Sequence, residues 1–124
     1  MRNGAEVLLD KAKFGEAADE MVSMFDREVF DYIIASDMGG MALASVVAYR
    51  LKKGIVSPCM DAPAGKYILI GFDMADGKLV KKQVDKIKEC KGTVIKMGFF
   101  KEDAARAIRK SLFRGIPVES VNLL

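Results

Sequence analysis

Two short segments of the chain combine an acidic side chain with glycine directly before a helical pattern. They are Ser36-Asp37-Met38-Gly39-Gly40 and Asp73-Met74-Ala75-Asp76-Gly77-Lys78. The second follows an apolar strand pattern over residues 66–71. Backbone amides at the start of a helix have no partner within the helix and can bind an anion. We therefore take both segments as candidate parts of one ligand site.

Each of these residues also has a purely structural interpretation. Asp37 and Asp73 could be turn-forming acids rather than functional ones. Asp76 could be the N-cap of the following helix and so occupy its free amides itself. Gly39 and Gly40 could serve a tight turn and a close contact between helix and strand. The sequence leaves both interpretations open.

The rest of the chain alternates strand and helix patterns. Apolar runs predict strands at 31–35, 55–56, 66–71, 93–97 and 115–123, and helical periodicity predicts helices at 5–25, 41–52, 79–90 and 102–113. Such alternation predicts an α/β fold with three layers, a mostly parallel sheet of four to five strands flanked by helices. We expect a single domain over 1–124, with an N-terminal helical region at 1–30. Ligands of such sheets bind at the carboxyl ends of the strands, where both segments lie.

Composition restricts the function further. The 124 residues are 51% hydrophobic and 30% charged, with a net charge of +3. The chain has no histidine, the commonest general base and metal ligand. The longest near-apolar run, 41–49, is too short to cross a membrane. Cys59 and Cys90 are far apart in sequence, and we expect them to be buried, reduced thiols of a cytoplasmic protein.

Several stretches together resemble one family of enzymes. Residues 33–44, Ile-Ile-Ala-Ser-Asp-Met-Gly-Gly-Met-Ala-Leu-Ala, are similar to the pyrophosphate loop and following helix of orotate phosphoribosyltransferases. Residues 66–78 resemble the phosphoribosyl-binding loop of the type I phosphoribosyltransferases, and 100–105 and 115–121 resemble an acidic helix start and closing strand of the same family. The resemblance covers 31–123, with a gap between 56 and 66, and implies a phosphoribosyltransferase-like fold.

The departures from the family pattern concern the site. Where the family has two adjacent acids, this chain has Phe72-Asp73, and the resemblance implies that Asp73 binds ribose hydroxyls. Where the family has Thr-Thr-Gly for the 5′-phosphate, this chain has Ala75-Asp76-Gly77. Two hydroxyl donors are therefore absent, and a carboxylate stands where an anion would bind. Residues 57–64, in place of the family's basic catalytic loop, contain no Lys, Arg or His that could stabilise a leaving pyrophosphate.

Three functions are compatible with this pattern. The protein could be a phosphoribosyltransferase-like binder of a nucleotide or phosphorylated sugar, with weak or no transferase activity. It could be an active, divergent glycosyltransferase of nucleotide metabolism, and would then use phosphoribosyl pyrophosphate and Mg²⁺. It could also be a nucleic-acid-binding regulator, although we expect the basic residues of 81–114 to be solvated helix faces. We assign no catalytic residue, no metal ligand and no other cofactor.

Association is expected from the same resemblance, because proteins of this fold are commonly dimers. The apolar residues that we consider in excess of the needs of the core are Met21, Met24, Phe25, Phe99, Phe100 and Phe113. We therefore expect a homodimer with an isologous interface.

Overall fold

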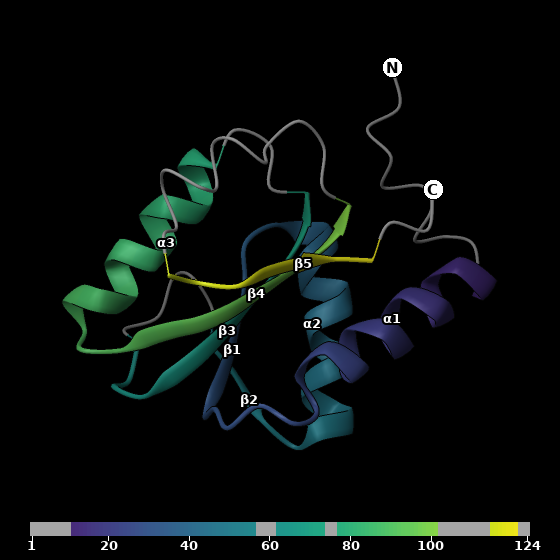
Figure 1. Ribbon diagram of the computed structural model, residues 1–124, viewed down its shortest axis with the longest axis horizontal. Coiled ribbons are helices and arrows are strands. Elements are labelled where there is room, and N and C mark those ends of the chain that lie inside the picture. The colour runs from purple at the N-terminus through teal and green to yellow at the C-terminus, as the bar shows by residue number, and fades with distance from the viewer. Residues whose placement is uncertain (1–10, 57–61, 74–76, 102–114, 122–124) are drawn as a thin grey trace.

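The computed structural model describes residues 11–56, 62–73, 77–101 and 115–121, which form three helices and five strands (Figure 1). In chain order the elements are α1 (Lys11–Phe25), β1 (Tyr32–Ala35), α2 (Met38–Leu51), β2 (Gly54–Val56), β3 (Lys66–Asp73), α3 (Lys78–Glu89), β4 (Thr93–Lys101) and β5 (Val118–Ser120). The helix predicted at 102–113 and the first residues of the helix predicted at 5–25 lie outside the described residues.

The five strands form one parallel sheet in the order β2-β1-β3-β4-β5. β1 lies between β2 and β3 and pairs with both. Its last residue, Ala35, lies opposite Ile70 of β3. The predicted parallel sheet is therefore confirmed. Because all strands run in one direction, the residues that follow β1 and β3 lie at the same edge of the sheet.

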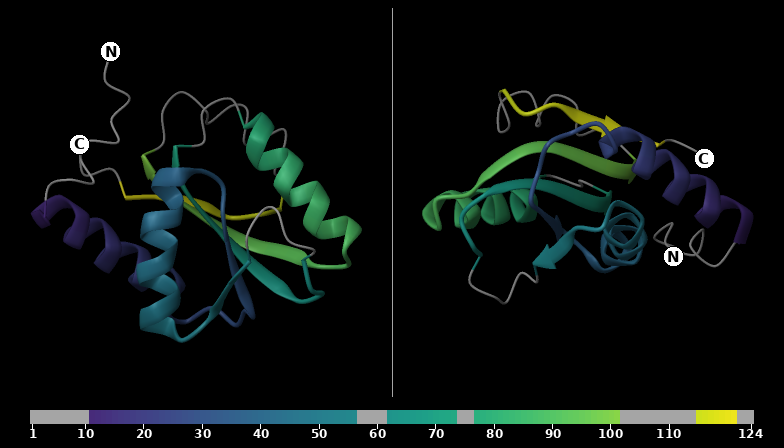
Figure 2. Two further views of the ribbon diagram at one scale, coloured as in Figure 1. Left: turned by 180° about the vertical axis from the view of Figure 1, so that it is seen from behind. Right: turned by 90° about the horizontal axis from the view of Figure 1, so that it is seen from below.

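Helices cover both faces of the sheet. Ile33 and Ile68 point into a core formed with α1 and α2, whereas the neighbouring Ile34 and Leu69 point into a second core formed with α3. This alternation is what a strand buried on both faces requires. Figures 1 and 2 show α1 beside α2, with α3 separate from both. The predicted three-layer architecture is thus confirmed. On α3 the apolar residues Val80, Val84 and Ile87 form the buried stripe that faces the sheet.

Some predicted boundaries are wrong. α2 begins at Met38 rather than at residue 41, because Asp37 caps the helix and both following glycines adopt its first turn. β4 continues beyond residue 97 to Lys101 and remains paired with β3 up to Asp73. Gly98 allows this continuation under α1, because a Cβ there would lie 2.7 Å from Phe25 Cζ. β5 is shorter than the strand predicted over 115–123.

Most of the apolar side chains assigned to a dimer interface belong to the core. Met21, Phe25, Phe99 and Phe100 are almost completely buried within the chain, and Met24 is partly buried. Phe113 lies outside the described residues. These four buried residues therefore cannot support the homodimer, which stays a prediction. Cys90 is a free thiol that is half-buried rather than buried as predicted, and Cys59 is not described.

Lys96 contacts segments from the N-terminal and the C-terminal part of the described chain. Lys96 of β4 donates a hydrogen bond from Nζ to the Met24 carbonyl oxygen at the end of α1 (2.8 Å). The same Nζ lies 3.4 Å from Glu28 Oε2 and 3.5 Å from Glu119 Oε2 on β5. The lysine side chain is 12% exposed, whereas those of Glu28 and Glu119 are 38% and 51% exposed, so only the lysine end of these ion pairs is shielded from water. Among the helices that the structure describes, none has the length and apolarity needed to span a bilayer.

Candidate functional site

The first predicted loop segment lies beside Asp73, the first residue of the second segment, at the carboxyl edge of the sheet. Ser36 extends the ladder of β1 by one residue, because its N–H donates to the Ile70 carbonyl oxygen of β3 (2.9 Å). The chain then turns at Asp37 and enters α2. Beside this turn, β3 ends at Asp73, and α3 begins at Lys78. The structure therefore places the start of α2 next to the last residues of β3, as the sequence predicts.

Asp37 is the residue that holds these two segments together. Its Oδ1 accepts hydrogen bonds from the Gly40 N–H in the first turn of α2 (2.5 Å) and from the Phe72 N–H of β3 (3.0 Å). Its Oδ2 accepts from the Phe72 N–H (3.1 Å) and from the Asp73 N–H (3.4 Å). Asp37 therefore has a structural role as the N-cap of α2, which differs from the turn-forming role that the sequence suggested as its structural interpretation. Beyond the last residue of β1, the Asp37 carboxylate accepts the N–H of Phe72, which a further strand residue would otherwise accept from β3.

Gly39 and Gly40 permit this contact by their lack of side chains. A Cβ on Gly40 would lie 2.6 Å from Gly71 Cα and 2.7 Å from the Ile70 carbonyl oxygen. A Cβ on Gly39 would lie 2.8 Å from the Cβ of Phe72. The predicted close approach of helix and strand is therefore confirmed, whereas the predicted tight turn is not, because both glycines are helical.

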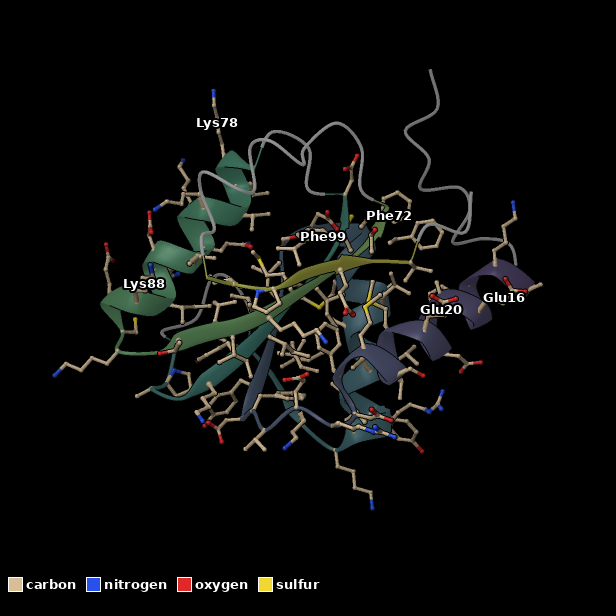
Figure 3. All side chains as sticks on the ribbon, in the orientation of Figure 1. Glu16, Glu20, Phe72, Lys78, Lys88 and Phe99 are labelled. Carbon is tan, nitrogen blue, oxygen red and sulfur yellow. The ribbon has the colours of Figure 1, made fainter. Side chains whose placement is uncertain are left out.

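Phe72 belongs to the core and not to the ligand side of the site. Its side chain is buried, and its ring stacks on that of Phe100, with centroids 4.9 Å apart and planes 4° from parallel. Figure 3 shows Phe72 at the same end of the sheet as Phe99. The position at which the resemblance implies a second acid thus packs an apolar ring against the α1–α2 side of the sheet.

The second loop segment is described only at its ends. Asp73 is partly buried at the end of β3, and Met74, Ala75 and Asp76 lie outside the described residues. The N-cap of α3 is Gly77, in the left-handed conformation with φ 80°, so the predicted N-cap at Asp76 is wrong. Glycine adopts this conformation without steric cost, which accounts for its position there. Lys78 is exposed in the first turn of α3 and extends away from the sheet (Figure 3).

Two buried polar side chains lie close to the end of β1. Ser36 is 4% exposed, and its Oγ occupies the space that the missing side chain of Gly71 leaves. Gln83 of α3 is 8% exposed, and its Nε2 donates to the Ala35 carbonyl oxygen (3.4 Å). Within the described part of the chain, neither Ser36 Oγ nor Gln83 Oε1 has a hydrogen-bond partner. Sequence analysis missed Gln83, although a polar residue inside the buried stripe of an amphipathic helix was a usable signal.

A small cavity opens at the turn between β1 and α2. It has a volume of about 200 Å³ and is lined by Ala35, Ser36, Asp37, Met38 and Met41. Met38 is 90% exposed, so its thioether borders the cavity from the solvent side. The described residues contain no cluster of three acidic, cysteine or histidine side chains that could hold a metal ion without help from a ligand.

Comparison with solved structures identifies the fold. The chain superposes on adenine phosphoribosyltransferase from Thermoanaerobacter pseudethanolicus with a TM-score of 0.81 at 19% identity, over 93% of this chain and 82% of that one. For orotate phosphoribosyltransferase from Aeropyrum pernix the TM-score is 0.81 at 17% identity, over 97% and 78%. No family model and no curated protein matches the sequence. The fold is therefore that of the type I phosphoribosyltransferases, and the comparison does not separate the orotate type from the adenine type.

A third match carries ligands. The adenine phosphoribosyltransferase of Trypanosoma brucei was solved in complex with AMP, pyrophosphate and ribose-5-phosphate, and it matches with a TM-score of 0.77 at 12% identity, over 93% of this chain and 66% of that one.

Proposed function

We propose that the protein binds a nucleotide or a phosphorylated sugar at the carboxyl edge of its sheet, with weak or no transferase activity. The observation that carries this proposal is the Asp37 carboxylate, whose bonds to the Phe72 and Asp73 amides join the start of α2 to the end of β3. Open α/β sheets bind their ligands at this edge. The likeness to phosphoribosyltransferase structures supports the same class of ligand.

In this proposal Asp73 accepts hydrogen bonds from sugar hydroxyls. It stands at the end of β3, it is partly buried, and its N–H donates to Asp37 Oδ2 (3.4 Å). The phosphate group lies toward the start of α3, where Lys78 adds positive charge. If Mg²⁺ accompanies the ligand, Asp73 would hold it together with the phosphate of the ligand, because Mg²⁺ is commonly bound by one or two carboxylates together with phosphates.

Weak or absent turnover follows from two features of the site. The resemblance implies a second acid at residue 72, and the stacked, buried Phe72 cannot supply it. The segment 57–64 has no cationic residue for a departing pyrophosphate. Since one preorganised electrostatic donor typically contributes about 10²–10³ in rate, the loss of several makes turnover slow or undetectable.

The binding proposal is tested by isothermal titration calorimetry with ribose 5-phosphate and with AMP, each in the presence of Mg²⁺. We expect saturable binding that Asp73→Asn weakens at least about tenfold, equivalent to the loss of one charge-assisted hydrogen bond. Asp19→Asn is the matched control, because Asp19 is exposed on α1 and pairs with Arg50 away from the site. If neither ligand binds at millimolar concentration, the proposal is wrong.

The second candidate is an active, divergent phosphoribosyltransferase, which the retained Asp73 at the end of β3 favours. It is separated from the first by an assay of pyrophosphate release from phosphoribosyl pyrophosphate with Mg²⁺ and a panel of bases that includes orotate and adenine. We expect no release above background. Release that Asp73→Asn abolishes would establish the active enzyme instead.

A further inference from the structure

Two buried oxygen atoms, Ser36 Oγ and Gln83 Oε1, belong to side chains that meet on one side of the sheet at the end of β1. A Cβ on Gly71 would contact both Ser36 Oγ and Phe99 Cε1, and Phe99 belongs to the core formed with α3. Gln83 reaches the same place from α3, because its Nε2 donates to the carbonyl oxygen of Ala35, the residue before Ser36. We propose that the two oxygens bind one internal water molecule, which joins α3 to the end of β1. This inference is independent of the proposed function.

The orientation of the Gln83 amide leaves its oxygen without a donor. With Nε2 on the Ala35 carbonyl oxygen, Oε1 can only accept, and the reversed orientation would place two acceptors against each other. Gln83 is buried, and no described residue donates to Oε1. A buried acceptor that lacks a donor lowers the folding equilibrium constant about tenfold. Oε1 therefore requires a group that donates a hydrogen bond to it.

The Ser36 hydroxyl supplies the second contact for such a group. It is buried, it has no partner among the described residues, and a hydroxyl can both donate and accept. A water molecule between the two side chains donates one hydrogen to Gln83 Oε1 and accepts the hydrogen of Ser36 Oγ. The second lone pair of the Ala35 carbonyl oxygen is available for its other hydrogen. The water then makes about three hydrogen bonds, the usual number for an internal water.

The surroundings favour a water molecule over an ion. Val80, Val84 and Phe99 form the adjacent core and are almost completely buried, so an ion would lose its hydration beside apolar side chains. Water has a route to this place, because Ser36 also lines the cavity of about 200 Å³ at the turn between β1 and α2. Gln83 is the polar residue within the otherwise apolar buried stripe of α3. The shared water therefore fixes the rotation of α3 about its own axis.

The water is tested directly by a crystal structure of the full chain at a resolution that shows ordered solvent. We expect one water molecule within hydrogen-bond distance of both Ser36 Oγ and Gln83 Oε1. The inference is overturned if the two side chains bond directly to each other, if another part of the chain occupies the position of the water, or if no ordered water lies there.

Whether the two oxygens share this water is tested by a double-mutant cycle in urea unfolding. Ser36→Ala and Gln83→Met remove one oxygen each with little change of shape, and we expect each to raise the unfolding equilibrium constant about tenfold. In the double variant neither buried oxygen remains, so its unfolding constant should not exceed that of the less stable single variant.

Ser45→Ala is the matched control for this cycle. Ser45 is exposed on α2, where its Oγ donates to the Met41 carbonyl oxygen. The effects of Ser45→Ala and Gln83→Met should therefore multiply. If the effects of Ser36→Ala and Gln83→Met also multiply, the two oxygens do not share a water and the inference is wrong.

Discussion

Replacement of Gly40 by alanine tests the contact between α2 and β3 that positions the site. The added Cβ would lie 2.6 Å from Gly71 Cα, 2.7 Å from the Ile70 carbonyl oxygen and 2.9 Å from Asp37 Oδ1. Two of these three neighbours are backbone atoms of a strand within the sheet, so they cannot move independently of it. The helix must shift instead, which also disturbs the bond from the Gly40 amide to Asp37.

The size of the effect follows from two opposing contributions. Overpacking at a rigid contact costs about 3 kcal/mol of the free energy of unfolding, the upper part of the usual range. Alanine in place of glycine in a helix recovers about 1 kcal/mol. We therefore expect Gly40→Ala to destabilise the protein by about 2 kcal/mol, which lowers the Tm of a chain of this size by about 8 °C.

Gly15→Ala is the matched control for this substitution. Gly15 also lies in a helix, α1, but a Cβ there would have no neighbour within 4 Å. Only the helix-propensity gain applies, so we expect a stabilisation of about 0.5–1 kcal/mol and a Tm raised by a few degrees. Both variants are compared by thermal and urea unfolding followed by circular dichroism. If Gly40→Ala melts at or above the wild-type temperature, the described spacing of α2 and β3 is incorrect.

Three further outcomes are expected. Lys96→Met removes the hydrogen bond to the Met24 carbonyl oxygen and the contact with Glu28, and should lower the urea midpoint by an amount equivalent to about 1–2 kcal/mol. Burial raises the pKa of Tyr67, whose hydroxyl donates to the Pro63 carbonyl oxygen (2.6 Å). The contribution of this tyrosine to stability is therefore complete below about pH 10 and is lost as the pH rises above it. The Tyr67→Phe variant should be less stable than the wild type at neutral pH but should lose less stability between about pH 10 and about pH 12, as measured by urea unfolding. Light scattering should give twice the mass of one chain at micromolar concentration, and a monomer mass would refute the homodimer.

The fold could be predicted because its strands carry strong local patterns. The apolar run that forms most of β3 has side chains for both faces of a parallel sheet, and α3 has its buried residues at helical spacing. These patterns depend only on neighbours in sequence. The buried state of Phe99 and Phe100 could not be predicted in the same way, because it depends on how far β4 extends and on what covers each face.

The location of the candidate site at one edge of the sheet could be predicted from the sequence, but its hydrogen bonds could not. Both loop segments were located at the correct edge because parallel strands end together. The role of Asp37 could not be derived, because its partners Phe72 and Asp73 lie 35 and 36 residues away and are set by the pairing of β1 with β3. The interpretation of Asp76 as the cap of α3 is wrong because a left-handed Gly77 occupies the cap position without a side-chain bond.

The contacts of Lys96 have a consequence for the order of folding during synthesis. α1 is made first, yet the lysine that binds its last turn follows 72 residues later, and Glu119 later still. At about 5–20 residues per second, the ribosome needs roughly 4–14 seconds to add the intervening residues. During this interval α1 has α2 to pack on, but neither Lys96 nor Gly98, which lies under Phe25. Final docking of α1 is therefore a late event of folding, completed only after most of the sheet has been synthesised.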